Sequence, residues 1–212
     1  MKPIKTSVVL PNIFAVSTKF VNFFLVKINA QYIAFDTGTS QEIALQELIR
    51  LNIKPEDIVD VFLTHSDSDH IGGIGLFRNA KIFIPKQEEQ MFNGSTKRTA
   101  FTKNRFNYSY KTLNDGETVD IDGASIKCIV TPGHTKGSAC YILNGKYLFS
   151  GDNFSLKDGK AQTFTALFNM DGKEQKKSII NIISRLQNIE AVFTGHHGYT
   201  EKFTEAFEHW QK

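Results

Sequence analysis

Residues 64–73 form the segment with the most chemical content in the chain. Two His and two Asp lie within six consecutive positions, at His65, Asp67, Asp69 and His70. Packing these groups into a protein core would be costly, because buried unpaired charges are unfavourable. A divalent cation removes that cost, since it attracts carboxylates and binds neutral imidazole. The segment is therefore predicted to bind metal, and a solvated polar loop is the alternative interpretation.

Further His and Asp residues fall at the ends of other predicted strands. Asp36, His134, Asp152 and His196 each lie at or just beyond such an end. Side chains at strand ends are held rigidly, whereas the loops beyond them can vary with substrate. Packing alone does not account for so many strands that end in His or Asp. We therefore predict that these residues meet in one site.

The strands that position these residues are predicted from runs of β-branched and aromatic side chains. They are expected at residues 6–10, 22–28, 31–36, 58–64, 81–85, 118–121, 125–131, 139–143, 146–150 and 190–194. Hairpin turns are predicted at Asn29-Ala30 and at Asn144-Gly145.

Helices are predicted at residues 41–52, from residue 71 to about 78, at 173–188 and from about 201 to 210. Ser40 is expected to cap the first of them. The apolar face of the first helix is predicted to contain Ile43, Leu45, Leu48 and Ile49, and that of the third Ile179, Ile180, Ile183 and Leu186. Residues 92–110 show no clear period and are expected to form a long loop or a mobile flap.

Composition bounds the class of protein. The chain has 212 residues, of which 41% are hydrophobic and 22% charged, as in ordinary globular proteins. A single domain spanning residues 1–212 is predicted. The 25 basic and 22 acidic residues leave a net charge of +3, which is too small to imply nucleic acid by itself. We expect no nucleic-acid partner, and the charge leaves an anionic small-molecule substrate open.

Cysteine usage and hydropathy bear on the compartment. Cys128 and Cys140 lie in apolar, strand-like runs, so buried free thiols are favoured over a disulfide. No run of 18 apolar residues occurs, so no membrane-spanning helix is expected. Pro11 and Asn12 interrupt the apolar start of the chain, which disfavours a signal peptide. A cytoplasmic protein is predicted.

The motifs around these residues resemble those of the metallo-β-lactamase superfamily, in order and spacing, along nearly the whole chain. The run HSDSDH at 65–70 is similar to the H-x-H-x-D-H signature of that family, with H-x-D-x-D-H in its place. The other four motifs are FDTG at 35–38, TPGHTKGS at 131–138, SGDN at 150–153 and TGHHG at 194–198.

The resemblance implies a fold and a ligand set. The fold is a four-layer αβ/βα sandwich of the α/β (α+β) class, with two mixed β-sheets flanked by helices. The first metal would be held by His65, Asp67 and His134, and the second by Asp69, His70 and His196. Asp152 and a water or hydroxide would bridge the two metals, and Asp36 would orient a metal-binding His. His197 is the alternative to His196 as ligand.

Asp67 departs from the family pattern, because most members have His at this position. Carboxylate oxygen is a harder ligand than imidazole and adds negative charge. The resemblance therefore implies two divalent metal ions, with Zn²⁺ favoured and Mn²⁺ or iron as alternatives because of Asp67. A weak or empty first site is a further alternative.

Such a site predicts a metal-dependent hydrolase acting on a small-molecule substrate. A hydroxide held between two metals attacks a carbonyl carbon or a phosphorus. The substrate classes are esters, thioesters, lactones, amides and phosphodiesters. The motifs GHTKGS and SGDN resemble those of glyoxalase II thioesterases, although Ser138 stands where that group usually has His. Asp69 is a candidate proton carrier as well as a ligand.

Two other classes of function are weighed against hydrolysis. One is an iron enzyme acting on oxygen, nitric oxide or a persulfide, which Asp67 supports. The other is a non-catalytic metal-binding domain, which the near-complete ligand set disfavours. An anionic group of the substrate could be attracted by Lys97, Arg98, Lys103, Arg105 and Lys136, and Tyr108, Tyr110 and Phe164 could line its pocket. The alternative for the basic residues is solvated surface charge, and the alternative for the aromatic residues is core packing.

Overall fold

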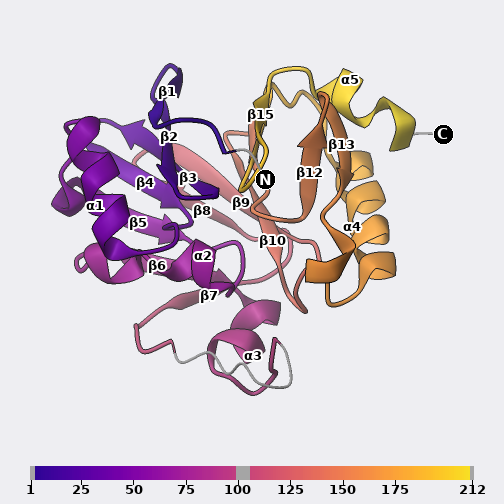
Figure 1. Ribbon diagram of the computed structural model, residues 1–212, viewed down its shortest axis with the longest axis horizontal. Coiled ribbons are helices and arrows are strands. Elements are labelled where there is room, and N and C mark those ends of the chain that lie inside the picture. The colour runs from indigo at the N-terminus through magenta and orange to yellow at the C-terminus, as the bar shows by residue number, and fades with distance from the viewer. Residues whose placement is uncertain (1–2, 99–105, 211–212) are drawn as a thin grey trace.

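Two mixed β-sheets packed face to face form the centre of the molecule (Figure 1). The computed structural model describes residues 3–98 and 106–210. The first sheet contains, in spatial order, β1 (Ser7–Leu10), β2 (Ile13–Thr18), β3 (Val21–Ile28), β4 (Gln31–Phe35), β5 (Ile58–Phe62), β6 (Lys81–Pro85) and β7 (Lys111–Leu113). Strands β1 to β4 pair antiparallel, and strands β4 to β7 pair parallel.

The second sheet has the spatial order β15-β14-β11-β10-β9-β8. Its strands are β8 (Thr118–Ile121), β9 (Ala124–Val130), β10 (Ala139–Leu143), β11 (Tyr147–Phe149), β14 (Ala191–Thr194) and β15 (Gly198–Thr200). Strands β11 and β14 pair parallel, and the other neighbours pair antiparallel. A separate hairpin is formed by β12 (Phe154–Lys157) and β13 (Lys160–Thr163).

Aromatic side chains fill the space between the two sheets. Phe35 of the first sheet stacks on Phe149 of the second, with ring centroids 3.9 Å apart. Phe62 packs edge-on against Tyr141, whose hydroxyl donates a hydrogen bond to the carbonyl of Leu63. These large buried rings supply much of the apolar contact that holds the sheets together.

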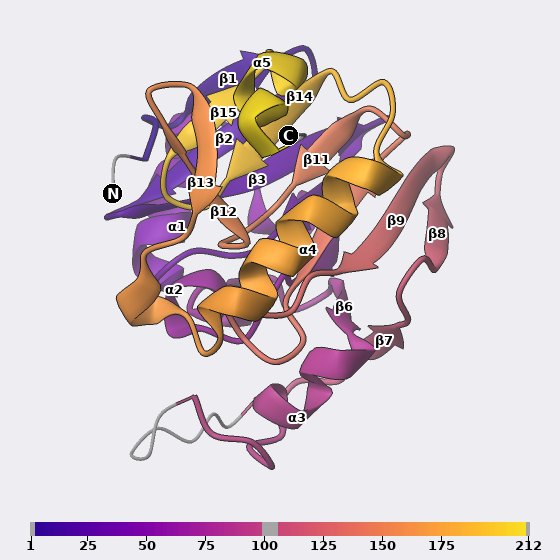
Figure 2. The ribbon, with the colours of Figure 1, turned by 90° about the vertical axis from the view of Figure 1, so that its right-hand side faces the viewer.

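Helices cover the outer face of each sheet. Helix α1 (Gln41–Arg50) lies on the first sheet and α4 (Gly172–Arg185) on the second, whereas α5 (Phe203–Phe207) packs against the β12–β13 hairpin (Figures 1 and 2). Each layer buries its own apolar cluster against the strands beneath it. The predicted four-layer arrangement of two mixed sheets flanked by helices is confirmed.

Helix α1 has the predicted N-terminal cap but buries only part of its predicted apolar face. The Ser40 side chain accepts a hydrogen bond from the Ile43 N–H, as predicted for the cap. Ala44 and Leu48 are the apolar side chains that the helix buries, whereas Ile49 is 66% exposed. The predicted apolar face was therefore wrong in part, because Ile49 is rotated about 100° around the helix from Leu48.

Helix α4 shows the same kind of difference. Ile179 and Ile182 are buried against the second sheet, whereas Ile180 is 52% exposed. The helix ends at Arg185, so Leu186 lies just beyond the last turn and the predicted end at residue 188 was too late. Both helices carry a wider apolar surface than the sheet beneath them covers.

The helix predicted from residue 71 to about 78 is wrong. A short helix, α2 (Ser68–Ile71), comes earlier, and a 3-10 turn follows at Ile74–Leu76. A Cβ on Gly72 would lie 2.1 Å from the Thr39 carbonyl oxygen, and one on Gly73 would lie 2.1 Å from that of Thr37. The two glycines therefore let the segment press against the loop after β4, and the regular helix stops there.

Several short elements were not predicted from the sequence. They are β2, β7, β12, β13, β15 and a helix, α3 (Glu89–Phe92), which follows a 3-10 turn at Lys86–Glu88. The proposed loop or flap at 92–110 falls partly on residues 99–105, which lie outside the described residues. The hairpins at Asn29-Ala30 and Asn144-Gly145 are confirmed, as are the buried free thiols of Cys128 and Cys140.

Candidate metal centre

Strand direction brings the predicted site residues together. Strands β4 and β5 run parallel in the first sheet, and β9, β11 and β14 share one direction in the second. Their carboxyl ends meet at one edge of the sandwich, as in other sheets that bind ligands beyond parallel strand ends. The segments that follow these strands, including helix α2, carry all eight predicted site residues, namely Asp36, His65, Asp67, Asp69, His70, His134, Asp152 and His196.

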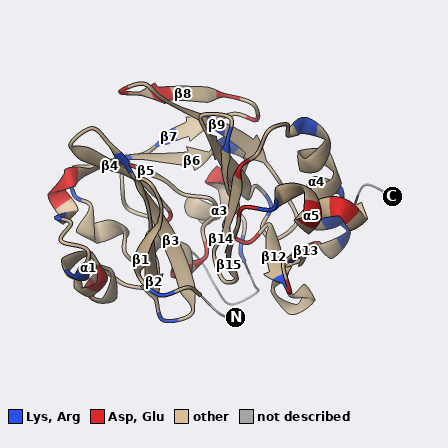
Figure 3. Cartoon of the chain, turned by 90° about the horizontal axis from the view of Figure 1, so that it is seen from above, with Lys and Arg blue, Asp and Glu red and all other residues tan. Residues whose placement is uncertain are grey.

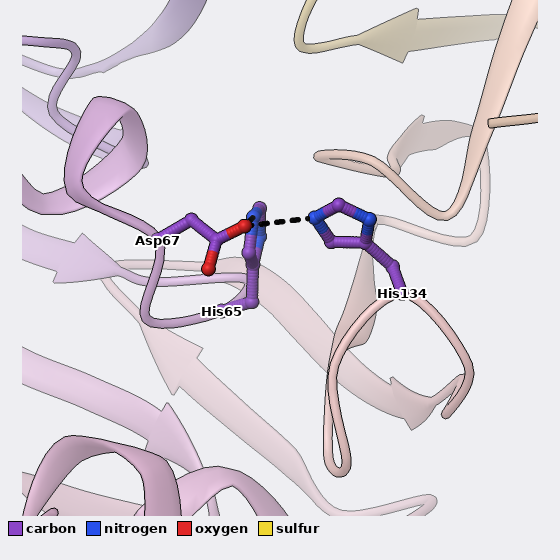
Figure 4. Close-up of side chains that lie close together, drawn as sticks. All are labelled: His65, Asp67 and His134. Atoms are coloured by element: carbon purple, nitrogen blue, oxygen red, sulfur yellow. Dashed lines mark hydrogen bonds and ion pairs between the residues drawn. The ribbon is translucent and has the colours of Figure 1, made fainter. Parts of the chain in front are cut away.

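A first group of side chains consists of His65, Asp67 and His134, whose potential ligand atoms lie within 4.8 Å of one another (Figure 4). Asp67 Oδ2 is 3.1 Å from His134 Nε2 and 3.7 Å from His65 Nε2. His65 and Asp67 follow β5, whereas His134 comes from the loop after β9, so the group joins the two sheets.

A second group consists of Asp69, His70 and His196. Asp69 Oδ2 lies 3.2 Å from His196 Nε2 and 3.8 Å from His70 Nε2. Helix α2 places Asp69 and His70 on consecutive positions of one short turn. His197 belongs to neither group, and its ring lies instead beside that of Phe164.

Asp152 lies between the two groups. Its Oδ2 is 3.6 Å from His134 Nε2 of the first group and 3.1 Å from His196 Nε2 of the second. Its Oδ1 is 3.4 Å from His70 Nε2. The carboxylate therefore contacts imidazoles of both groups, which is the arrangement that a bridging ligand needs.

Each of the four imidazoles is held through its Nδ1. Asp36 Oδ2 is 2.8 Å from Nδ1 of His70, and the backbone carbonyl of Phe20 is 2.7 Å from Nδ1 of His196. The other two contacts are Asn169 Oδ1 with His134 Nδ1 at 3.1 Å, and Thr64 Oγ1 with His65 Nδ1 at 2.9 Å. Because Nδ1 is occupied, Nε2 of every ring is left for the centre, as in His ligands of metal sites.

Asp36 is itself fixed by the chain that follows β5. Its Oδ1 accepts a hydrogen bond of 2.7 Å from the Thr64 N–H, and its Oδ2 accepts one of 2.9 Å from the Thr64 hydroxyl. Its backbone is in the left-handed region, with φ 63°. Asp36 thus lies behind His70, where it can orient the ring without facing the centre itself.

Buried polar atoms without partners test whether a cation fits this centre. Within residues 3–98 and 106–210, His65 Nε2, His70 Nε2 and Asp152 Oδ1 are buried and have no hydrogen-bond partner. Leaving such atoms unpaired is unfavourable, so native proteins rarely do so. Divalent cations at this centre would satisfy all three atoms, and imidazole nitrogen with carboxylate oxygen is a ligand set that suits Zn²⁺, Mn²⁺ and iron. The residues fit a metal centre.

The pKa shifts in the centre favour the metal-binding form at His65 and Asp152, whereas nearby carboxylates, despite burial, raise the pKa of His70 well above its ordinary value and that of His196 to about 9. Burial, together with the nearby His70 and His134, lowers the pKa of His65 well below its ordinary value, so this imidazole is neutral. Burial opposes ionisation of Asp152, but the charge of His70 and hydrogen bonds from His196 hold its pKa well below the usual range. Neutral imidazole and ionised carboxylate are the ligand forms that cations require.

Comparison with known proteins decides the family. The sequence model of the metallo-beta-lactamase superfamily matches residues 16–209. The chain belongs to this superfamily. It is 33% identical over 174 residues to a probable metallo-hydrolase of Methanocaldococcus jannaschii, a match that covers 80% of this chain and 74% of that protein.

A second curated relative of this superfamily member is the hydroxyacylglutathione hydrolase of Serratia proteamaculans. The two are 33% identical over 144 residues, which are 65% of this chain and 49% of the relative. The chain therefore spans about half the length of that enzyme.

Solved structures of metallo-β-lactamases share the fold. A subclass B3 enzyme isolated from a soil metagenome library has a TM-score of 0.70 and 20% identity, covering 92% of this chain and 80% of its own. A B3 enzyme described as the first with an active-site glutamic acid has a TM-score of 0.73 and 19% identity. The match covers 99% of this chain and 87% of that enzyme. At these identities the likeness concerns the fold alone.

Arg98 contacts the centre of this superfamily member in a way that its sequence did not reveal. Its Nε lies 2.7 Å from Asp67 Oδ1, and its Nη2 lies 3.0 Å from Asp67 Oδ2. Nη2 also donates to the carbonyl of Phe168. The charge of Arg98 is thus paired with Asp67, whereas Lys97 and Lys136 are exposed. Lys103 and Arg105, named as possible anion-binding residues, lie outside the described residues.

Other side chains support the centre from positions that carry no sequence signal. Asn169 lies in an irregular segment after a 3-10 turn, and no motif in the neighbouring sequence distinguishes it from an ordinary loop residue. Phe164 is buried with its ring 5.2 Å from that of His134 and 5.4 Å from that of His196. Tyr110 packs instead against Phe92, away from these imidazoles.

Proposed function

We propose that this superfamily member is a hydrolase that uses two divalent metal ions, with Zn²⁺ favoured, to cleave a small molecule. The convergence of four imidazole Nε2 atoms and three carboxylates, some of them buried without partners, supports the proposal. The cleaved bond belongs to an ester, thioester, lactone, amide or phosphodiester. The ions supply a nucleophilic hydroxide at neutral pH and a Lewis acid for the substrate oxygen.

The roles proposed for the chain's own residues follow from their contacts. The first ion is assigned to His65, Asp67 and His134, the second to Asp69, His70 and His196, and Asp152 to both. Asp36 accepts a hydrogen bond from the Nδ1–H of His70 and thereby keeps Nε2 of that ring free for binding.

Asp69 is proposed to accept a proton during hydrolysis. Three carboxylates belong to the proposed centre, and their side chains are 21% exposed at Asp69, 19% at Asp67 and 4% at Asp152. Asp69 is therefore the one most open to solvent. It can therefore pass a proton outward. Asp69 Oδ2 lies 3.2 Å from Nε2 of His196, at the proposed centre.

Replacing Asp69 by asparagine tests this role. The amide oxygen can still contact a cation, but the side chain cannot take up a proton. We expect metal content to stay near the wild-type value and turnover to fall by about 100-fold or more, the usual range for a general base. Metal analysis and steady-state kinetics on the same sample check the prediction. Full metal content with full turnover would exclude Asp69 as the proton acceptor.

Thioesters are proposed as the first substrate class to test. The relative from Serratia proteamaculans is a hydroxyacylglutathione hydrolase, and the residues aligned with it form the larger part of this chain. The motifs at 131–138 and 150–153 resemble those of thioesterases. Esters and lactones follow, because they present the same kind of carbonyl carbon.

Iron-dependent redox chemistry is the second candidate. Asp67 adds a carboxylate to the first group, and oxygen-rich sites bind Mn²⁺ and iron more readily than sites built from imidazole alone. The paired Arg98 compensates the added negative charge, so the carboxylate is also compatible with Zn²⁺. The nature of the bound metal therefore separates the two candidates.

Elemental analysis of the purified, untagged protein is the decisive experiment. About two Zn or Mn per chain would support the hydrolase and justify a screen of thioesters, esters, lactones, amides and phosphodiesters. Iron would favour redox chemistry on oxygen, nitric oxide or a persulfide. Absence of bound metal, even after reconstitution, would contradict both and leave a non-catalytic domain.

A small-molecule substrate and a cytoplasmic location are both proposed for this protein. None of the helices in the described residues is long and apolar enough to cross a membrane. Helix α1 carries acidic and basic positions together, at Glu42, Glu47 and Arg50 (Figure 3). Mixed charge of this kind is not the single-sign face that proteins use to track nucleic-acid phosphates.

A further inference from the structure

Glu88 is a buried carboxylate that belongs to neither group of predicted ligands. Its side chain is 0% exposed, and it lies in the 3-10 turn between β6 and α3. Oε1 accepts hydrogen bonds from the Ser66 N–H at 3.1 Å and the Ser66 hydroxyl at 2.9 Å. Oε2 accepts hydrogen bonds from the Thr135 hydroxyl at 2.9 Å and the Gly137 N–H at 2.8 Å.

These partners belong to the two loops that carry the first ligand group. Ser66 stands between His65 and Asp67, and Thr135 directly follows His134. One carboxylate therefore ties the loop after β5 to the loop after β9. The ligands of the second group are held elsewhere, His70 by Asp36 and His196 by a backbone carbonyl.

Backbone packing at the same place is independently tight. A Cβ built on Gly137 would lie 2.2 Å from the Glu88 nitrogen and 2.2 Å from the Gln87 carbonyl carbon. The loop that carries His134 thus presses directly on the turn that carries Glu88, and only glycine permits the approach. The separation between the loop that carries His134 and the turn that carries Glu88 is set at this contact.

We propose that Glu88 is a positioning residue for the first metal site, because its carboxylate fixes the separation of the two loops that carry His65, Asp67 and His134. The inference rests on the proposed function, since it takes this group to bind a metal ion. Glu88 does not touch the reacting atoms. It acts through Ser66, Thr135 and Gly137.

The chemistry of the pocket requires a carboxylate and not merely a polar side chain. Four donors converge on Glu88, and an ionised carboxylate accepts at both oxygens. Burial raises the pKa of Glu88 to about 7, and the hydrogen bonds from these donors, which are stronger to a charged acceptor than to a neutral one, oppose that rise. A glutamine would turn an NH₂ group toward donors at one of the two loops and would release that loop.

Glu88→Gln tests the proposal through metal binding. We expect the affinity for one of the two ions to fall about 10- to 100-fold, as when other supports of metal ligands are removed, and that for the other to stay unchanged. Stepwise binding constants come from titrating metal-free protein with Zn²⁺ against a chromophoric chelator. When Co²⁺ replaces Zn²⁺, the absorption bands of the Co²⁺ ion at the site with lowered affinity should change, and those of the other Co²⁺ ion should not.

Glu47→Gln is the matched control. Glu47 is also a buried carboxylate, 9% exposed, but it lies on α1 and contacts Thr6 and Arg50. This variant should lose stability without a change in either metal affinity or in the Co²⁺ spectrum. Should Glu88→Gln fail to fold, Ser66→Ala removes one donor only and should lower the same affinity about 3- to 10-fold.

The outcomes separate this inference from the function on which it rests. Wild-type protein that binds two ions, with both affinities and the Co²⁺ spectrum unchanged in Glu88→Gln, would overturn the inference and leave the proposed function standing. Equal losses at both ions would also overturn it, because a general structural role would then explain the result. Wild-type protein that binds no ion would overturn the proposed function and the inference together.

Discussion

Replacing Asp152 by alanine is expected to lower turnover about 1000-fold and to remove metal from the protein. Asp152 contacts His134 in the first group and both His70 and His196 in the second. Its loss therefore weakens both proposed ion sites at once. A metal ion contributes several kcal/mol of transition-state stabilisation, and each 1.36 kcal/mol is a factor of ten in rate.

The measurement pairs metal analysis with kinetics on whichever substrate the wild-type protein hydrolyses. Asp158→Asn is the control, because Asp158 is an exposed residue in the turn between β12 and β13. That variant should keep wild-type metal content and turnover. An Asp152→Ala protein that retains both ions and most of its turnover would show that this carboxylate does not bridge the site.

Removing the metal from the wild-type protein should lower its melting temperature by about 10 °C. Without a cation, His65 Nε2, His70 Nε2 and Asp152 Oδ1 stay buried with no hydrogen-bond partner among the described residues. A ligand present at 1,000 times its dissociation constant stabilises a fold by about 4 kcal/mol. For a chain of 212 residues, each 1 kcal/mol shifts the melting temperature by about 2–4 °C.

Differential scanning calorimetry with and without a chelator measures this shift, and added Zn²⁺ should restore the original melting temperature. The Asp152→Ala variant is an internal control, because the chelator should change its melting temperature much less than that of the wild type. A wild-type protein whose metal is fully removed with no change in melting temperature would contradict a buried metal centre.

Local patterns in the sequence were enough to locate the candidate centre. His65, Asp67, Asp69 and His70 share one short run, and the remaining predicted residues each follow a strand whose apolar composition marks its end. Because parallel strands end at a common edge, strand ends that carry His or Asp indicate a shared location from the amino-acid order alone. The structure brings all of these residues together, and their roles as ligands remain proposals.

The packing of helices against the sheets was harder to predict from the sequence than the location of the centre. Ile49 and Ile180 look like core residues in a helical period, yet both are largely exposed. The sequence shows that a helix has an apolar surface, but the sheet beneath it decides which part is covered. The stop at Gly72 likewise depends on the loop after β4, which approaches from more than thirty residues away.

The sequence by itself indicated the family and the chemical types of the candidate ligands, because both depend on short motifs, and the two-sheet class of fold was implied by that family resemblance. Only the tertiary structure decided that Arg98 pairs with Asp67 and that Glu88 joins two loops. Neither residue carries a motif, and each acquires its partners only when the aromatic core closes the sheets on each other. Contacts between distant segments depend on that closure, so a local pattern cannot specify them.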